Sequence, residues 1–130
     1  MLVSITDMSI SFIILEIVEM IEDEKELERT FPITREWFRT WLESKSEEEI
    51  IGLTDSPASC PIANALRNCD LKFNEVFADY GEVRLNDWIT LENPQWVNYF
   101  MIEIDSLGIG EIEITVKEAV EALDRVDKEL

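Results

Sequence analysis

The sequence predicts an α+β, mainly α fold, with about five helices and one small antiparallel β-hairpin in a single compact domain over residues 1–130. Three observations lead to this prediction. A chain of 130 residues is the usual size of one domain around one core. Apolar residues recur at helical spacing in several segments. One segment instead alternates apolar and polar residues on either side of a turn, which is typical of a hairpin.

The first predicted element is a helix from about Ser9 to Arg29. Its buried face follows helical spacing through Ile10, Ile13, Ile14, Ile17, Val18 and Ile21. The opposite side is acidic, with Glu16, Glu19, Glu22 and Asp23, and Phe12 and Leu15 point toward it. Because β-branched isoleucine lowers helix propensity, a strand over residues 9–15 is an alternative. The apolar run within this helix is too short to span a bilayer.

Two further helices are predicted between residues 32 and 53. Pro32 ends the first element, and Thr34 can cap a helix over residues 35–44. Its apolar stripe consists of Trp37, Phe38, Trp41 and Leu42, which we interpret as core residues. Ser46 and Glu49 form a capping box before an apolar run, which predicts a short helix that stops at Gly52.

The middle of the chain predicts one helix and the hairpin. After a loop over residues 54–59, Pro61 is suited to the first turn of a helix that extends to about Asn68. Residues 71–78 and 82–86 then alternate around the turn sequence Asp79-Tyr80-Gly81, which predicts two paired strands. The pattern at residues 88–91 admits a further strand.

The last third predicts two helices separated by a short strand. Asn93 as N-cap and Pro94 as first helical residue open a helix that ends near Gly108 and Gly110. Its apolar stripe consists of Trp96, Val97, Phe100, Met101, Ile104 and Leu107. Residues 111–114 alternate as a strand does. Thr115 and Glu118 form a capping box for a final helix over about 116–128.

The charge of the chain indicates what it can bind. The sequence has 29 Asp and Glu against 11 Lys and Arg, a formal net charge of −18. The acids run from Asp7 to Glu129, mixed with apolar residues, so they coat a folded surface. Such a surface repels nucleic acid and anionic membranes. The expected partner is a protein with a basic surface. The alternative is that the charge only keeps the protein soluble.

The composition excludes much catalytic and metal chemistry. The chain has no histidine and two cysteines, Cys60 and Cys69, so a Ser-His-Asp triad cannot form and a structural zinc site is not expected. We predict no metal and no cofactor. Cys60 at a helix N-terminus is a candidate reactive thiol, and the alternative interpretation is a small buried residue. Cysteines spaced this far apart on a helix remain free thiols, which predicts a cytoplasmic location.

These observations predict a non-enzymatic acidic binding protein. A sharper hypothesis is an inhibitor that mimics nucleic-acid charge, in composition similar to small acidic proteins of phages and mobile elements that block defence machinery. Its contacts would be Glu16, Glu19, Glu22, Asp23 and Glu26. One alternative is an adaptor or homo-oligomeric protein that uses an apolar patch of Phe12, Leu15 and Trp88. A second alternative is a small thiol-dependent redox protein that uses Cys60.

Overall fold

The computed structural model describes residues 24–129. Within this range the fold is α+β and mainly α, as predicted, with five helical segments and two small antiparallel sheets. Residues 24–30 are helical. The labelled elements are α2 (Arg35–Glu43), β1 (Ile50–Leu53), α3 (Pro61–Asn68), β2 (Val76–Ala78), β3 (Glu82–Leu85), β4 (Ile89–Glu92), α4 (Gln95–Asp105), β5 (Glu113–Thr115) and α5 (Val116–Glu129).

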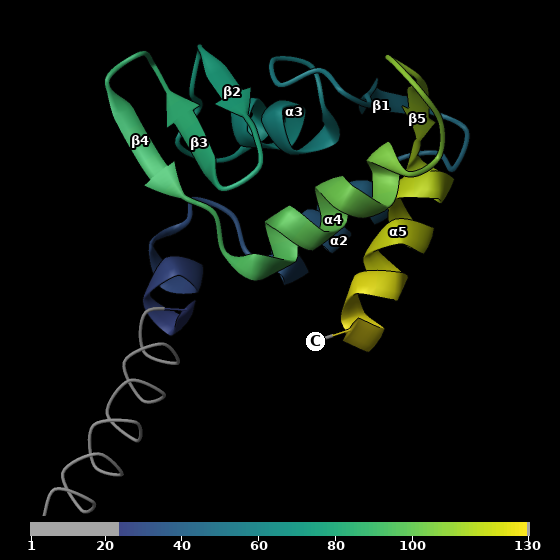
Figure 1. Cartoon of the computed structure of the whole chain (residues 1–130), viewed down its shortest axis with the longest axis horizontal. Coiled ribbons are helices and arrows are strands. Elements are labelled where there is room, and N and C mark those ends of the chain that lie inside the picture. Colours follow the sequence, from purple (N-terminus) through teal and green to yellow (C-terminus); the bar gives the residue numbers. More distant parts are fainter. Residues whose placement is uncertain (1–23, 130) are drawn as a thin grey trace, which may run out of the picture.

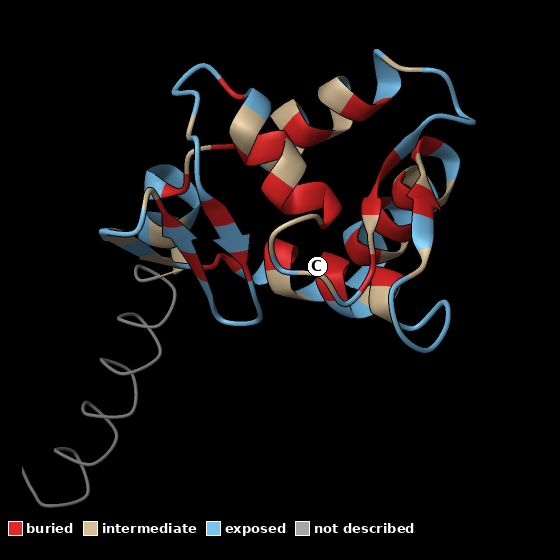
Figure 2. Cartoon of the chain, turned by 90° about the horizontal axis from the view of Figure 1, so that it is seen from above, coloured by how far each residue is buried: buried red, intermediate tan, exposed pale blue. Residues whose placement is uncertain are grey.

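The two sheets lie at opposite ends of one side of the molecule, with α3 between them and α2, α4 and α5 beneath (Figure 1). One sheet has the strand order β2-β3-β4, and the other pairs β1 with β5. Helix α5 packs against both α2 and α4. The buried faces of the helices and of both sheets point to a common interior (Figure 2).

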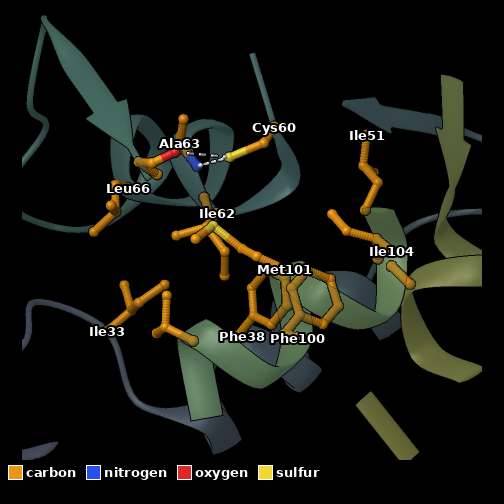
Figure 3. Close-up of a cluster of buried hydrophobic side chains, with 14 of the residues drawn as sticks. Ile33, Phe38, Ile51, Cys60, Ile62, Ala63, Leu66, Phe100, Met101 and Ile104 are labelled. Atoms are coloured by element: carbon orange, nitrogen blue, oxygen red, sulfur yellow. Dashed lines mark hydrogen bonds between the residues drawn. The ribbon is translucent and has the colours of Figure 1, made fainter. Parts of the chain in front are cut away.

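The core is a single cluster that is organised around aromatic contacts (Figure 3). Phe38 of α2 lies 5.0 Å from Phe100 of α4 in an edge-to-face arrangement and 5.7 Å from Trp96, centroid to centroid. Such pairs contribute about 0.5–1.5 kcal/mol beyond the area that they bury. The predicted core assignment holds for Trp96, which is buried, and Trp37 and Trp41 pack half-buried against the core.

The predicted bounds of α2, α3 and α5 are confirmed to within one residue. Helix α4 ends at Asp105, earlier than predicted, and Leu107 of its predicted stripe is exposed. Thr34 caps α2 by accepting a hydrogen bond from the Trp37 N–H at 3.0 Å. Helix α3 begins at Pro61 and ends at Asn68. The Thr115–Glu118 capping box forms reciprocally, at 3.1 and 3.2 Å. Of the predicted helix from Ser9 to Arg29, the described part from residue 24 is helical, and residues 9–23 lie outside the described range.

The predicted cap of α4 is wrong. Pro94 occupies the N-cap position and the helix begins at Gln95. The Asn93 side chain turns into the fold instead, where its amide donates to the Asp79 carbonyl at 2.7 Å and to Asn98 Oδ1 at 3.0 Å. The Gln95 N–H donates to a carboxylate oxygen of Glu24 at 2.8 Å. A distant acid therefore binds the helix N-terminus, where negative charge is favourable.

The predicted short helix after Ser46 is also wrong, because its apolar run forms strand β1. This strand pairs with β5 in antiparallel register, Gly52 opposite Ile114 and Leu53 opposite Glu113. Ile51 is thereby buried in the core. Pairing with a strand more than sixty residues away outweighs a local capping signal of about 1 kcal/mol, and no local pattern encodes it.

The predicted hairpin is confirmed in a shorter form with a third strand added. Strands β2 and β3 pair as Val76–Leu85, Phe77–Arg84 and Ala78–Val83. Residues 71–75 lie outside the strand, and Lys72 has φ of 50°, a left-handed conformation that a strand does not accept. Strand β4 extends the sheet, as the pattern at residues 88–91 allowed. Of the alternating segment at 111–114, residues 113 and 114 belong to β5, which lies in the second sheet.

We expect Gly52→Ala to destabilise the fold by about 1–3 kcal/mol, a typical penalty for overpacking. A Cβ at this position would lie 2.6 Å from the Pro61 nitrogen and 2.8 Å from the Cys60 carbonyl carbon, and backbone atoms cannot move aside as side chains do. Urea unfolding measures the change. Glu48→Ala in the exposed turn before β1 is the control, and equal losses for both variants would contradict the account.

Candidate binding surface

The predicted site residues fall into two groups. Glu16, Glu19, Glu22, Asp23, Phe12 and Leu15 lie outside the described residues. The other three come from separate elements: Glu26 is exposed on the helical segment 24–30, Trp88 is 79% exposed between β3 and β4, and Cys60 is 4% exposed at the start of α3. Trp88 is therefore available for contact, as the sequence indicated, and Cys60 is not.

Cys60 serves as the N-cap of α3. Its Sγ accepts a hydrogen bond from the Ala63 N–H at 3.5 Å, within the buried cluster of Figure 3. Burial raises the pKa of the thiol to about 11, although the hydrogen bonds from the Ala63 and Ile62 backbone lower it. The reactive-thiol hypothesis needs a lowered pKa, so the shift runs in the opposite direction.

Cys69 lies at the other end of α3. It is buried, and its thiol donates to the Leu66 carbonyl at 3.1 Å. Both cysteines are free, as predicted from their spacing. The two thiols therefore act as small core residues at the ends of one buried helix.

Four of the eleven basic side chains form ion pairs with acids of the described residues. Arg39 of α2 bonds to Asp124 and Asp127 of α5 at 2.9 and 2.7 Å, and Arg35 also reaches Asp127 at 3.2 Å. Arg125 bonds to Glu103 at 2.7 Å, and Lys45 pairs with Glu49 at 3.4 Å. All eleven basic residues of the chain lie within residues 24–129. The surface is acidic mainly because the chain has 29 acids against 11 basic residues, and these pairs neutralise four of the bases.

The three-stranded sheet presents a distinct polar face to solvent. Val76, Ala78, Val83 and Leu85 point into the core. The opposite face, here called the outer sheet face, carries Phe77, Glu82, Arg84, Thr90 and Glu92. Because the strands are in register, Phe77, Arg84 and Thr90 form one row across it, and Glu82 lies opposite Glu92 in the next.

Two carboxylates of like charge therefore face each other on this surface. The Asn93 N–H donates to the Gly81 carbonyl at 2.9 Å, so residues 81 and 93 are a hydrogen-bonded pair. Glu82 and Glu92 are then a non-hydrogen-bonded pair, the type in which side chains approach more closely. Arg84 lies over the Phe77 ring at 5.3 Å, and no ion pair among residues 24–129 includes it. Like charges so placed destabilise a sheet.

A second acidic pair lies at the other end of the sheet. The pKa of Glu75 is raised by a hydrogen bond with Asp87 and by the charge of that residue. Asp87 sits in the three-residue loop between β3 and β4, where Asn86 and Asp87 both have positive φ. Asn86 Oδ1 accepts from the N–H groups of Asn74 and Glu75 at 3.0 and 3.1 Å. These bonds hold Glu75 beside the loop that also presents Trp88.

Sequence reasoning missed both acidic pairs. Each joins residues that are separated along the chain, and neither stands in a run of acids. The available signal was the register of the hairpin, because extending the predicted pairing to a third strand places Glu92 opposite Glu82. The predicted acidic surface instead rested on the periodicity of the first helix.

Two hollows in the surface do not have the character of an active site. A groove of about 420 Å³ includes Trp41, Lys45, Glu49, Gly52 and Asn64 in its lining. Several of its polar groups are used within the fold, since Lys45 pairs with Glu49 and Asn64 donates to the Ile51 carbonyl at 2.8 Å. An active site needs polar groups that converge on empty space.

The second hollow, of about 30 Å³, lies beside Tyr80 and Asp105. The Tyr80 hydroxyl donates to Asp105, and burial followed by this hydrogen bond raises the pKa of Tyr80. Asp105 also accepts from the Asp55 N–H at 3.1 Å. Among residues 24–129 no cluster of three or more acidic or cysteine side chains is placed to hold a metal ion.

Comparison with protein-family models, with curated proteins and with solved structures gives no match to this chain. In the described part of the chain, no helix combines the length and the apolar character that crossing a membrane requires. The interpretation of the binding surface therefore rests on its own geometry.

We expect Cys60 to resist alkylation while the protein is folded. A pKa of about 11 in place of the ordinary value lowers the thiolate fraction at pH 8 by roughly two orders of magnitude. The Cys69→Ala variant isolates Cys60, and labelling with iodoacetamide followed by mass spectrometry compares native and urea-unfolded protein. Similar rates in the two states would show an accessible thiolate and would restore the redox alternative.

We expect Glu75→Gln to stabilise the fold at pH 7 and to have less effect in acid. The raised folded-state pKa of Glu75 means that the folded chain holds this proton more tightly than the unfolded chain does. The stability that it contributes is therefore present at low pH and is lost as the pH rises through that pKa. Urea unfolding between about pH 3 and pH 7 measures it. Asp87→Asn is the matched partner variant. If the stability gains of the two single variants add fully in the double variant, Glu75 and Asp87 are not coupled and the account is contradicted.

Proposed function

We propose that this protein is a non-enzymatic acidic binding protein that engages a basic, nucleic-acid-binding protein by imitating the charge of nucleic acid. The observation that supports this most directly is the pair Glu82 and Glu92, two carboxylates opposite each other on an exposed sheet face with no ion-pair partner in the described residues. Repulsion between like charges held opposite each other lowers the stability of the folded sheet, and a bound cationic partner would relieve that repulsion.

The spacing of the acids suits this role. Glu82 and Glu92 lie at one end of the sheet, and Glu75 and Asp87 lie at the other. At about 3.3 Å per strand residue, the two pairs are on the order of 10 Å apart. That distance covers roughly three phosphate steps of one DNA strand. A protein groove lined with lysine or arginine for a phosphate backbone would meet a pair of carboxylates at about every third phosphate position.

The N-terminal segment contributes further acids to the chain. The first 23 residues contain Asp7, Glu16, Glu19, Glu22 and Asp23 and no basic residue. Together with exposed Glu26 these five acids add negative charge, and no Lys or Arg among residues 1–23 offsets it. We infer that the partner meets both this segment and the outer sheet face. The protein then acts in the cytoplasm, where such partners occur and where the free thiols of Cys60 and Cys69 stay reduced.

We expect Glu92→Lys to weaken binding while it stabilises the fold by about 0.2–1 kcal/mol, because lysine opposite Glu82 replaces repulsion with attraction. The tagged full chain retains partners from an extract of the source cells, and washes of rising salt release them for identification. Glu121→Lys is the matched control, since it changes net charge equally on an exposed site of α5. A second set reverses Glu16, Glu19, Glu22 and Asp23.

The two outcomes of this experiment are distinct. The proposal expects a basic partner that the parent chain and Glu121→Lys retain to the same salt concentration and that Glu92→Lys releases earlier. Equal retention by all variants, including the N-terminal set, would contradict it. So would a partner without a basic surface.

A second candidate function follows from Trp88. A tryptophan that is 79% exposed is a frequent centre of protein interfaces, which favours an adaptor or an oligomer that uses an apolar patch. The same pull-down separates this candidate, because its partner would persist at high salt and would be lost with Trp88→Ala. Recovery of only further copies of this chain would favour the oligomer.

A further inference from the structure

The outer edge of β4 is an open hydrogen-bonding edge. Backbone pairs in an antiparallel ladder alternate between bonded and non-bonded. Since the Asn93 N–H donates to the Gly81 carbonyl, Leu91 and Ile89 bond to β3 in turn. The N–H and C=O groups of Thr90 and Glu92 therefore point away from the sheet, and no residue of the described range bonds to them. Figure 1 shows β4 as the outermost strand.

The opposite edge of the same sheet is closed. On β2 the outward groups belong to Val76 and Ala78. The Ala78 N–H donates to the Pro57 carbonyl at 2.8 Å, and the Val76 carbonyl accepts from Arg67 at 3.1 Å.

The small sheet is closed along β1 and in part along β5. The Ile51 carbonyl accepts from Asn64, and the Leu53 N–H donates to Ser59. On the outer edge of β5 the Thr115 N–H donates to Glu118. Strand β4 differs because neither of its outward-facing residues, Thr90 and Glu92, has a bonding partner in the described range.

Natural sheets protect edge strands by short length, by charged side chains, by proline or by a bulge. Strand β4 reads Ile-Thr-Leu-Glu and pairs with β3 without a register shift, so its protection is its short length and one charged residue, Glu92. That residue is an acid and faces a second acid in Glu82, so it repels acidic strands and attracts basic ones. The edge thus combines open backbone donors and acceptors with a negative face.

We propose that the outer edge of β4 is a docking strand for an extended basic segment of the partner, which adds to the sheet as a fourth strand. This inference rests on the proposed function and names the form that the basic partner takes at this surface. Backbone bonds to Thr90 and Glu92 would supply affinity, and alternate lysine or arginine side chains would lie beside Glu92 and Glu82. A second copy of this chain fits poorly, because two chains of net charge −18 repel each other.

The test uses a defined probe, an acetylated and amidated eight-residue peptide of alternating lysine and valine. Its matched control is N-methylated at alternate residues on the edge that would face β4, so the charge and the side chains stay and the hydrogen-bond donors are lost. Titration of the full chain at low salt is expected to show binding that is at least tenfold weaker for the methylated peptide, the effect of losing about two backbone bonds. Hydrogen exchange of the Thr90 and Glu92 amides is expected to slow with the parent peptide.

A protein variant gives an independent arm. Thr90→Pro removes an outward N–H, and proline is tolerated on an edge strand where that group faces solvent. Thr90→Ala keeps the N–H. We expect the proline variant to lose about threefold in affinity or more, the effect of losing one backbone bond, and the alanine variant to lose less than twofold, with thermal unfolding confirming that both fold. If the proline variant fails to fold, the methylated peptide alone decides.

Three results would overturn the inference. Equal binding of the two peptides would mean capture by charge alone, which leaves the proposed function intact and removes the added strand. Amides of Thr90 and Glu92 that are already protected in the free chain would mean that another part of the protein covers the edge, or a second copy does if protection depends on concentration. Failure of both peptides to bind at low salt would reject the basic partner as well.

Discussion

The position of α3 is the constraint on which the arrangement of both sheets depends. This short helix is buried over most of its length, and it packs on β2 at one end of the molecule and on β1 at the other. The backbone of β1 passes so close to its first turn that only Gly52 fits there. Arg67 near its other end hydrogen-bonds the carbonyls of Val76 and Ala58. The helix therefore closes one edge of each sheet, and the surface that remains open is on the far side of the three-stranded sheet.

Much of the fold was predictable because its helices carry capping signals in their own local sequence. Thr34, Pro61 and the Thr115–Glu118 pair act within one turn of the residues that they cap, so spacing alone reveals them. The failures share a different cause. Strand β1 exists because β5 pairs with it, and α4 is capped by Glu24 from 71 residues away. In both places a plausible local signal, Ser46 with Glu49 and Asn93 before Pro94, was outweighed by a contact that no window of neighbouring residues contains.

Of the candidate surface, only the sign of its charge was predictable from the sequence. The net charge led to the prediction of a basic partner, and the absence of histidine excludes the triads that need it. Trp88 stood out as exposed because little apolar pattern surrounds it. The placement of Glu82 opposite Glu92 depends on the register of a third strand. The open edge of β4 depends on which of its backbone groups form no hydrogen bond with β3. Cys60 illustrates the reverse. Its position at a helix start is readable from Pro61, but its burial, which decides its chemistry, is a property of the tertiary structure.

The pairing of β1 with β5 has a consequence for how the chain folds as it is made. Residue 50 meets residue 115, and α2 rests on α5, so the middle of the domain is completed by elements that are synthesised more than sixty residues later. Until residues 113–129 have left the ribosome, β1 has no partner strand and the apolar stripe of α2 lacks part of its cover. Contacts this distant form late and slow folding. In the interval the apolar stripe of α2, with Trp37 and Trp41, stays exposed on the nascent chain.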